Sequence, residues 1–390
     1  MMKMKIALVE VWLNAPTKNN LAIYVHIPFC ASKCAYCNFT SFANCSEKSK
    51  NDYFNALEKE ICSNKQNSFK RNVSSIFIGG GTPSVVDAKH IINILNNIKQ
   101  NYNVMPDAEI TIEANPSSIT LEKLKQYKNC GINRISFGVQ SIFDNDLKKL
   151  NRNQTKKQVK QAIKLSKKIG IKNINLDFLL GLENQSIFKI IKTAFFCACH
   201  KISHISAYML MVEDKTILKN MIKQKKYIQP SEEKTVNFYN TISKLLKFFG
   251  FKRYETSNFA KKSFQSKHNL TYWRGGEYIG FGLAAHSYVS GIRFENTSEM
   301  SEYIIGNHTF SKEVLSEQTK KEEFVMLGLR LENGINLNDY YNQFNTSLLK
   351  EKNREINFLL GKKIIKIKNN NLFIKPKFMG VLNQVILMLI

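Results

Sequence analysis

The sequence predicts an α/β fold in which parallel strands alternate with helices. Strand-like and helix-like segments alternate from about residue 21 to about residue 211, in roughly six repeats. The strand-like segments are short apolar runs, which are typical of strands buried on both faces. Tight hairpin signals are scarce in this region, which disfavours antiparallel pairing. A closed or partly closed β/α barrel and an open doubly wound sheet both fit this pattern.

Local patterns justify each element. Residues 22–27 form an apolar run that ends at Pro28, which indicates a buried strand. Thr120 precedes a helical pattern and Gly131 follows it, as expected of an N-cap and a helix end. By the same criteria we expect strands at residues 75–78, 109–113, 134–139, 173–180, 204–210 and 372–374, and helices at residues 47–61, 85–98, 120–127, 155–169, 187–197 and 232–249.

The chain is long enough for one large domain and a smaller one. We expect an N-terminal extension at residues 1–20 and a β/α domain at residues 21–212. An accessory region would follow at residues 213–310, and a small C-terminal domain at residues 311–390. The apolar run at residues 381–390 is too short to span a bilayer, and we expect it to pack on the core as a strand or helix.

The composition is that of a folded protein, with 43% hydrophobic and 23% charged residues. The formal net charge of +26 is unusual, and such charge can attract nucleic acid, anionic membranes or anionic substrates. Lysines are spread along the whole chain, so compositional drift explains the excess more simply. Charge alone therefore identifies no partner.

The eight cysteines indicate a reducing compartment. Secreted disulfide frameworks are short and dense in cysteine, and this chain is neither. Residues 1–13 mix basic and apolar residues around Glu10 without the usual small-residue cleavage pattern, so we do not expect a signal peptide. These observations predict a cytoplasmic protein.

Three cysteines, Cys30, Cys34 and Cys37, follow the first predicted strand. Loops after strands lie at the carboxyl end of a β/α sheet, where such proteins place their chemistry. Thiolates suit soft metals and iron–sulfur clusters. Three thiolates leave one iron of a [4Fe–4S] cluster open to a small molecule. A zinc site would need a fourth ligand, and the nearest candidates, His26 and Cys45, lack the usual paired spacing.

A glycine triplet, Gly79 to Gly81, follows the next predicted strand and precedes Thr82 and Pro83. Glycines at a strand end let the backbone approach a ligand closely and present N–H groups to it. A glycine triplet alone is most often an ordinary turn. Its position after a strand and downstream of the cysteines favours a binding loop.

The spacing Cys-x3-Cys-x2-Cys, with Tyr36 before the last cysteine, resembles the signature of the radical S-adenosylmethionine (SAM) superfamily. The longer string from Tyr24 to Cys30 is similar to that of oxygen-independent coproporphyrinogen III oxidases and HemW-type haem chaperones. The resemblance covers most of the chain. It implies a partial (β/α)6 radical SAM barrel, an accessory region and a small C-terminal domain. It also implies that Cys30, Cys34 and Cys37 hold a [4Fe–4S] cluster, whose electron would cleave SAM to a 5′-deoxyadenosyl radical.

The same resemblance implies a set of SAM contacts. Glu113, Gln140 and Asp177 fall at or near predicted strand ends, where they could bond ribose hydroxyls or the amino group. Arg152 could pair with the methionine carboxylate. Each residue alone could be a solvated or capping polar group, whereas their shared position at one end of the sheet favours binding. The full set is Tyr24, Tyr36, Gly80, Gly81, Thr82, Glu113, Gln140, Arg152 and Asp177.

A second cluster of polar and aromatic residues lies further along the chain, at residues 254–259 and 268–273. The string His-Asn-x-x-Tyr-Trp from His268 to Trp273 resembles a motif associated with haem in HemW-type chaperones. Its mixture of apolar rings and polar tips suits a flat macrocycle. A lone His is more often structural than a ligand, but the resemblance implies that His268 contacts haem, with axial ligation as one form of that contact.

Phe39 favours the chaperone branch of this family. The decarboxylating oxidases carry a further Cys two residues after the third cluster Cys, and this chain has Phe39 there. The chain also departs from the family pattern elsewhere. Gln154 stands where His is usual, and the Gly-Leu-Pro-Gly-Gln and Gly-Pro-Gly-Ala-His strings are altered at Glu183, Asn184, Leu283 and Ala284.

The sequence therefore predicts a radical SAM protein with a [4Fe–4S] cluster, SAM and haem as cofactors. The leading hypothesis is a haem chaperone that binds haem and delivers it to acceptor proteins. The alternatives are an enzyme, the oxygen-independent coproporphyrinogen III oxidase, and a zinc-stabilised nucleic-acid-binding protein. We expect no nucleic-acid partner, and peripheral contact with a membrane is left open.

Overall fold

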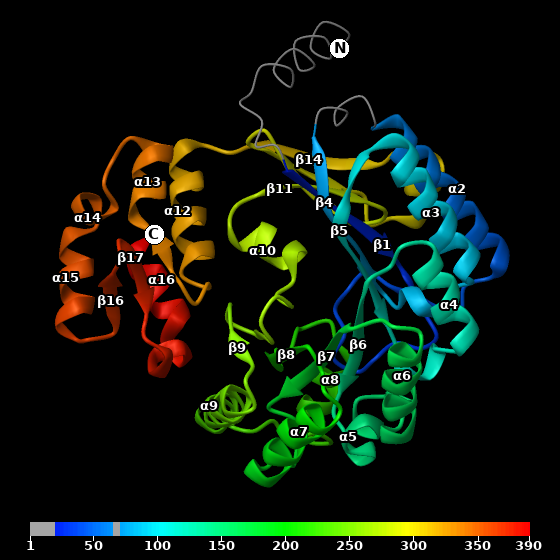
Figure 1. The fold of residues 1–390 in the computed structure, drawn as a ribbon, viewed down its shortest axis with the longest axis horizontal. Coiled ribbons are helices and arrows are strands. Elements are labelled where there is room, and N and C mark those ends of the chain that lie inside the picture. The colour runs from blue at the N-terminus through cyan, green and yellow to red at the C-terminus, as the bar shows by residue number, and fades with distance from the viewer. Residues whose placement is uncertain (1–19, 65–70) are drawn as a thin grey trace, which may run out of the picture. The chain divides into compact units, whose positions relative to one another are not determined.

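The computed structural model describes residues 20–64 and 71–390 (Figure 1). These residues form two compact units, each assembled from segments far apart in the sequence. The first unit holds the described residues up to 137, with residues 157–172 and 276–314. The second unit holds residues 138–156, 173–275 and 315–390. Of the predicted N-terminal extension, residues 1–20, only Asn20 lies among the described residues.

Parallel strands form the centre of the first unit. β1 (Asn20–Ile27) pairs in parallel with β4 (Asn72–Gly80) on one side and with β11 (Glu277–Phe281) on the other. β4 pairs with β5 (Asn103–Ala114), and β5 pairs with the first half of β6 (Arg134–Gln140). Most side chains of β1 are buried, as expected for a parallel strand covered on both faces.

Helices connect these strands, and polar side chains cap their first turns. α2 (Glu47–Ser63) begins at Ser46, and α4 (Leu121–Asn129) begins at the predicted N-cap Thr120; both hydroxyls accept a backbone N–H of the first turn. α3 (Ala88–Asn101) buries apolar residues at helical spacing against the sheet. The remaining elements are β2 (Phe29–Cys30), β3 (Phe42–Ala43), α6 (Lys156–Lys168), α11 (Met300–Ile304) and the 3₁₀ turns Pro83–Val85 and Pro116–Ser118.

Beyond β11 the sheet becomes antiparallel, which we did not predict. β11 pairs with β12 (His286–Val289), β12 with β13 (Ile292–Asn296), and β13 with β14 (Thr309–Val314). Ser290 and Gly291 join β12 to β13, and both have positive φ, of 53° and 76°. Two such residues make the hairpin turn whose twist matches that of the strands.

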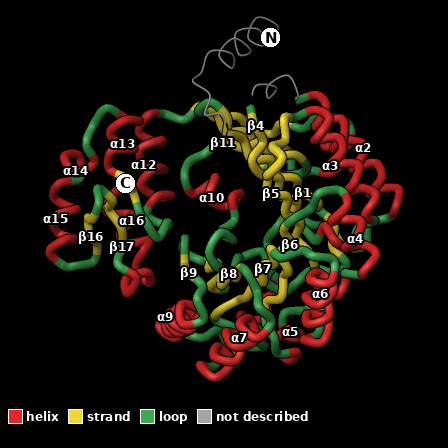
Figure 2. Tube along the Cα trace, viewed as in Figure 1, coloured by secondary structure: helices red, strands yellow, loops and turns green. Residues whose placement is uncertain are grey.

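The second unit contains its own strands, visible in yellow in Figure 2. β7 (Asn173–Leu180) pairs in parallel with β8 (His204–Met209). β10 (Asn258–Ala260) runs antiparallel to β8 and pairs with β9 (Lys252–Arg253). The helices of this part are α5 (Asp144–Lys149), α7 (Ile187–Cys199), α8 (Ile217–Lys223), α9 (Glu232–Phe248) and α10 (Lys267–Trp273).

The C-terminal part of the second unit is a small helical segment with a three-stranded antiparallel sheet. β17 (Asn371–Ile374) lies at the centre of this sheet, between β15 (Ile335–Asn336) and β16 (Ile365–Lys368). The last apolar run is a helix, α16 (Leu382–Leu389), which buries Leu382, Val385, Ile386 and Leu389 at helical spacing. The other elements are α12 (Glu317–Gly328), α13 (Leu337–Phe344), α14 (Leu348–Glu351), α15 (Asn353–Gly361) and the 3₁₀ turn Pro376–Val381.

The predicted α/β class with parallel strands and a small C-terminal region is confirmed. The strand predicted at residues 173–180 has the same bounds in the structure. The strand predicted at residues 109–113 starts earlier, at Asn103, because its more exposed first half also pairs with β4. The register shifts between Val73 and Ser75 beside this stretch, which contains the exposed Pro106. Among the described residues, none of the helices combines the length and the apolar character that a bilayer span requires.

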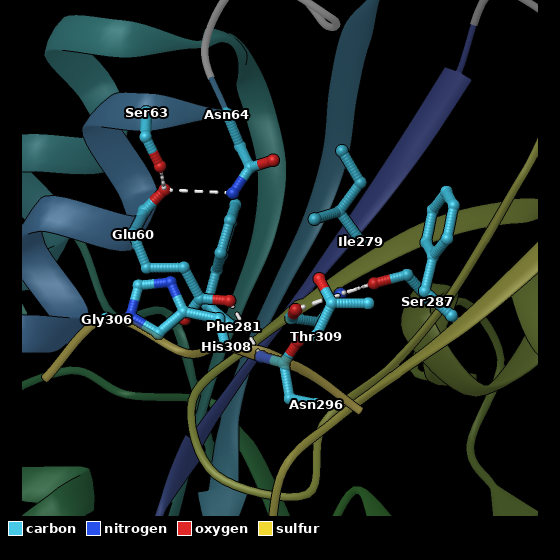
Figure 3. A pocket seen from close by; sticks show the side chains of 12 residues that line it. Glu60, Ser63, Asn64, Ile279, Phe281, Ser287, Asn296, Gly306, His308 and Thr309 are labelled. Atoms are coloured by element: carbon cyan, nitrogen blue, oxygen red, sulfur yellow. Dashed lines mark hydrogen bonds between the residues drawn. The ribbon is translucent and has the colours of Figure 1, made fainter. Parts of the chain in front are cut away.

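A buried carboxyl group joins α2 to the antiparallel strands of the first unit (Figure 3). Glu60 is 3% exposed, and it accepts hydrogen bonds from the Tyr303 hydroxyl at 2.5 Å, the Gly282 N–H at 2.8 Å and the Asn296 amide at 2.7 Å. It borders a cavity of about 400 Å³ that His308 also lines. Burial raises the pKa of Glu60 from 4.5 to about 7, against the opposing effect of the three hydrogen bonds.

Glu60 should make folding stability depend on pH. Its pKa is higher in the folded state, so the stabilisation is complete below about pH 4.5 and is lost as pH rises through about 7. Glu60→Gln removes this titration. In urea unfolding, the stability of the unsubstituted chain relative to Glu60→Gln should fall by about 2.5 kcal/mol from about pH 5 to about pH 8.

Glu122→Gln, at an exposed position of α4, serves as the matched control for the Glu60 experiment. Its stability difference from the unsubstituted chain should change little over the same pH range, because the side chain is exposed to solvent in the folded chain. If the stability difference between Glu60→Gln and the unsubstituted chain changes as little with pH as that of the control, the raised pKa of Glu60 is contradicted.

Candidate functional site

The three cysteines lie on a loop that short strands close at its base. Phe29 and Cys30 of β2 pair in parallel with Phe42 and Ala43 of β3, and the Phe42 N–H donates to the Pro28 carbonyl at 2.7 Å. The loop between these strands carries the second and third cysteines. The structure thus presents all three predicted cluster residues from one loop after β1.

The sulfur atoms lie in a partly buried, polar environment. Cys30, Cys34 and Cys37 are free and half-buried. Burial raises the pKa values of the Cys30 and Cys37 thiols, and the Lys33 ammonium opposes this effect weakly. The Thr82 hydroxyl lies 3.7 Å from Cys30 Sγ and can bond the sulfur. Bound iron would favour the thiolate forms that burial disfavours, so the donor set fits an iron–sulfur cluster.

A single-ion site does not describe this loop. Within residues 20–64 and 71–390, no three His, Cys, Asp or Glu side chains converge on one metal position. Cysteines that bind separate irons of a cubane need no such convergence. His26, a candidate zinc ligand, has both ring nitrogens engaged: Nδ1 lies 3.0 Å from the Tyr24 hydroxyl and Nε2 lies 2.8 Å from the Thr40 carbonyl.

The glycine triplet packs directly against the cysteine loop. The Gly81 N–H donates to the Ile27 carbonyl and the Thr82 N–H to the Phe29 carbonyl, both at 2.8 Å. A Cβ on Gly81 would lie 2.7 Å from the Phe29 carbonyl oxygen and 3.0 Å from Cys30 Sγ. These distances leave no room for a side chain, so glycine is required by the close approach of two backbone segments.

Gly80 is required for a second reason. Its φ is +110°, and a Cβ would lie 2.6 Å from the His26 ring. Its N–H donates to Glu113 Oε2 at 3.1 Å, so the carboxylate at the end of β5 sits beside the glycine turn. The carboxyl ends of β4 and β5 therefore bring Gly80 and Glu113 together, while Gly81 and Thr82 lie beside Cys30 and Tyr24 reaches the turn through His26. Tyr36 lies on the same loop, between the second and third cysteines.

Gln140 and Arg152 belong to the second unit, where they flank Gly138. A Cβ on Gly138 would lie 3.2 Å from Arg152 Nη2 and 3.3 Å from Gln140 Nε2. Gln140 has a φ of +65°, which is uncommon for a residue with a side chain and frequent at functional sites. Gln154 replaces the usual His, and its amide bonds the carbonyls of Gly138 at 2.9 Å and Val139 at 2.6 Å while it accepts from Arg152 at 3.0 Å.

Residues 181–185, which follow β7 and differ from the family's usual Gly-Leu-Pro-Gly-Gln, still form a defined turn. Asn184 has a φ of +58°, the left-handed conformation that glycine usually supplies. Gln185 Oε1 accepts the Gly181 N–H at 2.7 Å, and Glu183 pairs with Lys149. Ala284 likewise adopts a positive φ, of 53°, where the related string has glycine.

Asp177 is the start of a buried hydrogen-bond chain that sequence reasoning missed. Asn175 Nδ2 donates to Asp177 Oδ1 at 2.7 Å. His204 Nδ1 lies 2.6 Å from Asn175 Oδ1, and its Nε2 lies 2.8 Å from the Tyr254 hydroxyl. The Ser266 N–H donates to the same hydroxyl at 3.2 Å. Since an amide oxygen only accepts, His204 Nδ1 carries a proton in this arrangement.

The series of hydrogen bonds ends at α10, the helix that carries the string from His268 to Trp273. Ser266 is the N-cap of α10, and its hydroxyl accepts the Asn269 N–H. His268 is 1% exposed, and its Nε2 lies 2.8 Å from the Tyr272 hydroxyl. Tyr272 and Trp273 are half-buried. His268 is therefore engaged inside the protein, and ligation of iron by Nε2 would require exchange of the Tyr272 hydrogen bond.

Comparison with protein families identifies the class of this chain. Residues 24–197 match the model of the radical SAM superfamily, and residues 315–377 match the HemN C-terminal domain. The solved structure of coproporphyrinogen III oxidase (HemN) from Escherichia coli matches 98% of this chain and 93% of its own, with a TM-score of 0.84 at 20% identity. The match confirms the predicted fold. The chain belongs to the radical SAM superfamily.

Similar proteins narrow the assignment from the superfamily to one family within it. A protein named heme chaperone HemW from Bacillus subtilis is 34% identical over 83% of this chain and 87% of its own length. The heme chaperone HemW of Escherichia coli is 33% identical over 80% of this chain and 82% of its own. A mitochondrial radical S-adenosyl methionine domain-containing protein 1 from Danio rerio is 31% identical over 80% and 73%. The chain is a member of the HemW family.

The buried hydrogen bonds that link Asp177 to α10 should depend on His204, and so should folding stability. His204→Ala leaves Asn175 Oδ1 and the Tyr254 hydroxyl without this partner and opens a cavity, so we expect a loss of about 3 kcal/mol or more in urea unfolding. His200→Ala is the control, because His200 is half-buried and its Nδ1 bonds the Phe196 carbonyl one turn earlier in the same helix. Its loss should stay below about 1 kcal/mol. Equal losses for the two variants would contradict the role of His204.

Proposed function

We propose that this protein binds haem and delivers it to acceptor proteins, on a radical SAM scaffold. The observation that carries the proposal is the identity of about one third with proteins named heme chaperone HemW, over most of both chains. Phe39 supports the same branch. It occupies the position of the extra Cys of the decarboxylating oxidases and is 67% exposed, so that thiol is replaced by a phenyl ring beside the cysteine loop.

We assign Cys30, Cys34 and Cys37 as the ligands of a [4Fe–4S] cluster. When bound, such a cluster supplies an electron to SAM at its open iron. In this chain, the N–H groups of the Gly80–Thr82 turn bond Glu113 and the backbone of the cysteine loop, and the Glu113 carboxylate can bind an amino or hydroxyl group beside this turn. Thr82 bonds Cys30 and thereby orients its sulfur.

The assignment of further SAM contacts rests on resemblance. Arg152 offers a guanidinium held by the Gly138 carbonyl at 2.6 Å, suited to a carboxylate. Gln140 supplies an amide at the end of β6, and Asp177 supplies a carboxylate within β7. The aromatic rings proposed to contact SAM are Tyr36, on the cysteine loop, and Tyr24, on β1.

We place haem at α10. Tyr272 and Trp273 offer half-buried rings for a macrocycle, and His268 supplies the imidazole of the same helix. Two roles are open to this imidazole. His268 ligates the iron after its hydrogen bond with Tyr272 breaks, or it positions the Tyr272 ring through that bond. We propose ligation, which the experiment below distinguishes from positioning.

Haem titration tests the proposal. The cluster-reconstituted chain is titrated anaerobically with haem and followed in the Soret band. We expect saturation near one haem per chain, and His268→Ala should weaken binding by about tenfold or more, a loss of at least about 1.4 kcal/mol. Tyr272→Phe should keep the spectrum of the ligated iron, because it frees Nε2.

The outcomes separate the alternatives. An altered Soret position in His268→Ala that added imidazole restores would support ligation. Loss of binding in Tyr272→Phe with an unchanged spectrum in His268→Ala would support positioning instead. No saturable binding would overturn the haem function, and formation of protoporphyrinogen from coproporphyrinogen III would then support the oxidase alternative.

We also propose a cytoplasmic location. All eight cysteines lie among the described residues and all are free thiols, which fits a reducing compartment. The acceptors would be haem proteins that bind haem after it leaves α10.

A further inference from the structure

The cavity beside Glu60 shares no lining residue with the cysteine loop, the glycine turn or α10 (Figure 3). Its volume of about 400 Å³ lies within the range of about 300–1,000 Å³ that is usual for small-molecule sites. The C-terminal end of α2 and the strands β11 to β14 supply most of its lining. All these segments belong to the first unit, so the cavity is formed within a single unit.

The lining combines apolar surface with hydrogen-bonding groups. Ile279, Phe281 and Phe294 supply apolar surface, and Glu60 and Asn296 supply a carboxyl and an amide group. None of the described lining residues is Lys or Arg, although the chain carries a formal net charge of +26. The lining therefore lacks the cationic side chains that usually hold an anion.

Glu60 gives the cavity a carboxyl group without a countercharge. Its three donors, the Tyr303 hydroxyl, the Gly282 N–H and the Asn296 amide, are all uncharged. Within the described part of the chain, no Lys or Arg side chain pairs with Glu60, and burial raises its pKa to about 7. Oε1 accepts only the bond from Asn296, so it keeps a second lone pair for a further donor. A bound cation would supply the countercharge and favour the ionised carboxylate.

His308 adds a second acceptor that lacks a donor. Its imidazole bonds the Tyr303 carbonyl, and its Nε2 is buried with no hydrogen-bond partner among the described residues. Because a carbonyl only accepts, Nδ1 makes this bond and carries a proton, and Nε2 of the neutral ring is an acceptor. Burial lowers the pKa of His308, which favours the neutral ring. A buried acceptor without a donor is unfavourable, so a donor on a bound molecule would stabilise this arrangement.

We propose that this cavity binds a short aliphatic diamine or polyamine. One ammonium group pairs with the Glu60 carboxylate, and another N–H donates to His308 Nε2. The methylene groups pack on the Phe281 and Phe294 rings. A neutral polyol would satisfy the acceptors but leave Glu60 without a countercharge, and an anion would meet a carboxylate and no cationic lining. The inference adds a ligand class to the haem and SAM proposed above and depends on neither.

Isothermal titration calorimetry tests the inference. The cluster-reconstituted full chain is titrated with putrescine and with spermidine in about 150 mM salt, which screens charges on the protein surface. We expect saturable binding near one ligand per chain. The overall positive charge of the chain repels a polyamine, so saturation indicates a local site. Butanediol, the uncharged analogue of putrescine, should bind at least about tenfold more weakly.

Two variants remove the two acceptors separately. Glu60→Gln keeps the size of the side chain but removes its charge, and it should lower the affinity for spermidine by at least about tenfold. His308→Phe keeps an aromatic ring but removes Nε2, and it should lower the affinity by about fivefold. His308 is half-buried, so this second variant keeps the test valid if Glu60→Gln does not fold.

Glu122→Gln and His286→Phe are the matched controls. Both residues are exposed in the first unit, and neither lines the cavity. We expect the affinity of each control for spermidine to stay within about twofold of that of the unsubstituted chain. The inference is overturned if neither amine binds saturably or if butanediol binds as tightly as putrescine. It is equally overturned if the acceptor variants that fold bind spermidine as tightly as the unsubstituted chain does.

Discussion

The close approach of the glycine turn to the cysteine loop is the constraint on which the candidate site depends. Gly80 packs on the His26 ring and Gly81 on the Phe29 carbonyl and Cys30 sulfur, at distances that exclude any side chain. His26 in turn bonds the Thr40 carbonyl beyond the third cysteine. The end of β4 therefore fixes both ends of the loop that presents the three thiols, and the N–H groups of Gly81 and Thr82 bond the backbone of that loop.

Buried polar groups extend this organisation through each unit. Glu60 joins α2 to the antiparallel strands, and the price of burying its carboxyl is a pKa raised to about 7. In the second unit, His204 connects Asp177 with the N-cap of the helix that carries His268. Buried hydrogen bonds of this kind hold one arrangement because an unpaired partner would be costly. In the second unit this network holds Asp177 and the start of α10 in place, whereas Glu60 fixes the packing of α2 in the first unit.

Much of the fold and the cysteine site could be predicted because their signals are local. Strand 173–180 and the Thr120 cap follow from residues within one element, and the cysteines lie within one loop. The antiparallel strands were missed because their signal was a single pair, Ser290 and Gly291. His204 was missed and the contacts of Gln154 were not predicted, because their partners are residues distant in sequence or backbone carbonyls, which periodicity does not reveal. Each of these two side chains meets its partners only when the chain folds.

The central claim is that three cysteines and the neighbouring glycine turn bind a cluster that carries SAM. Electron paramagnetic resonance of the reduced, reconstituted chain tests it most directly. The account predicts a [4Fe–4S] signal whose g values shift when SAM is added, and a smaller shift in Glu113→Gln, whose amide is a weaker partner for an amino group. A cluster signal that SAM leaves unchanged, or no cluster in the chain with all three cysteines intact, would contradict it.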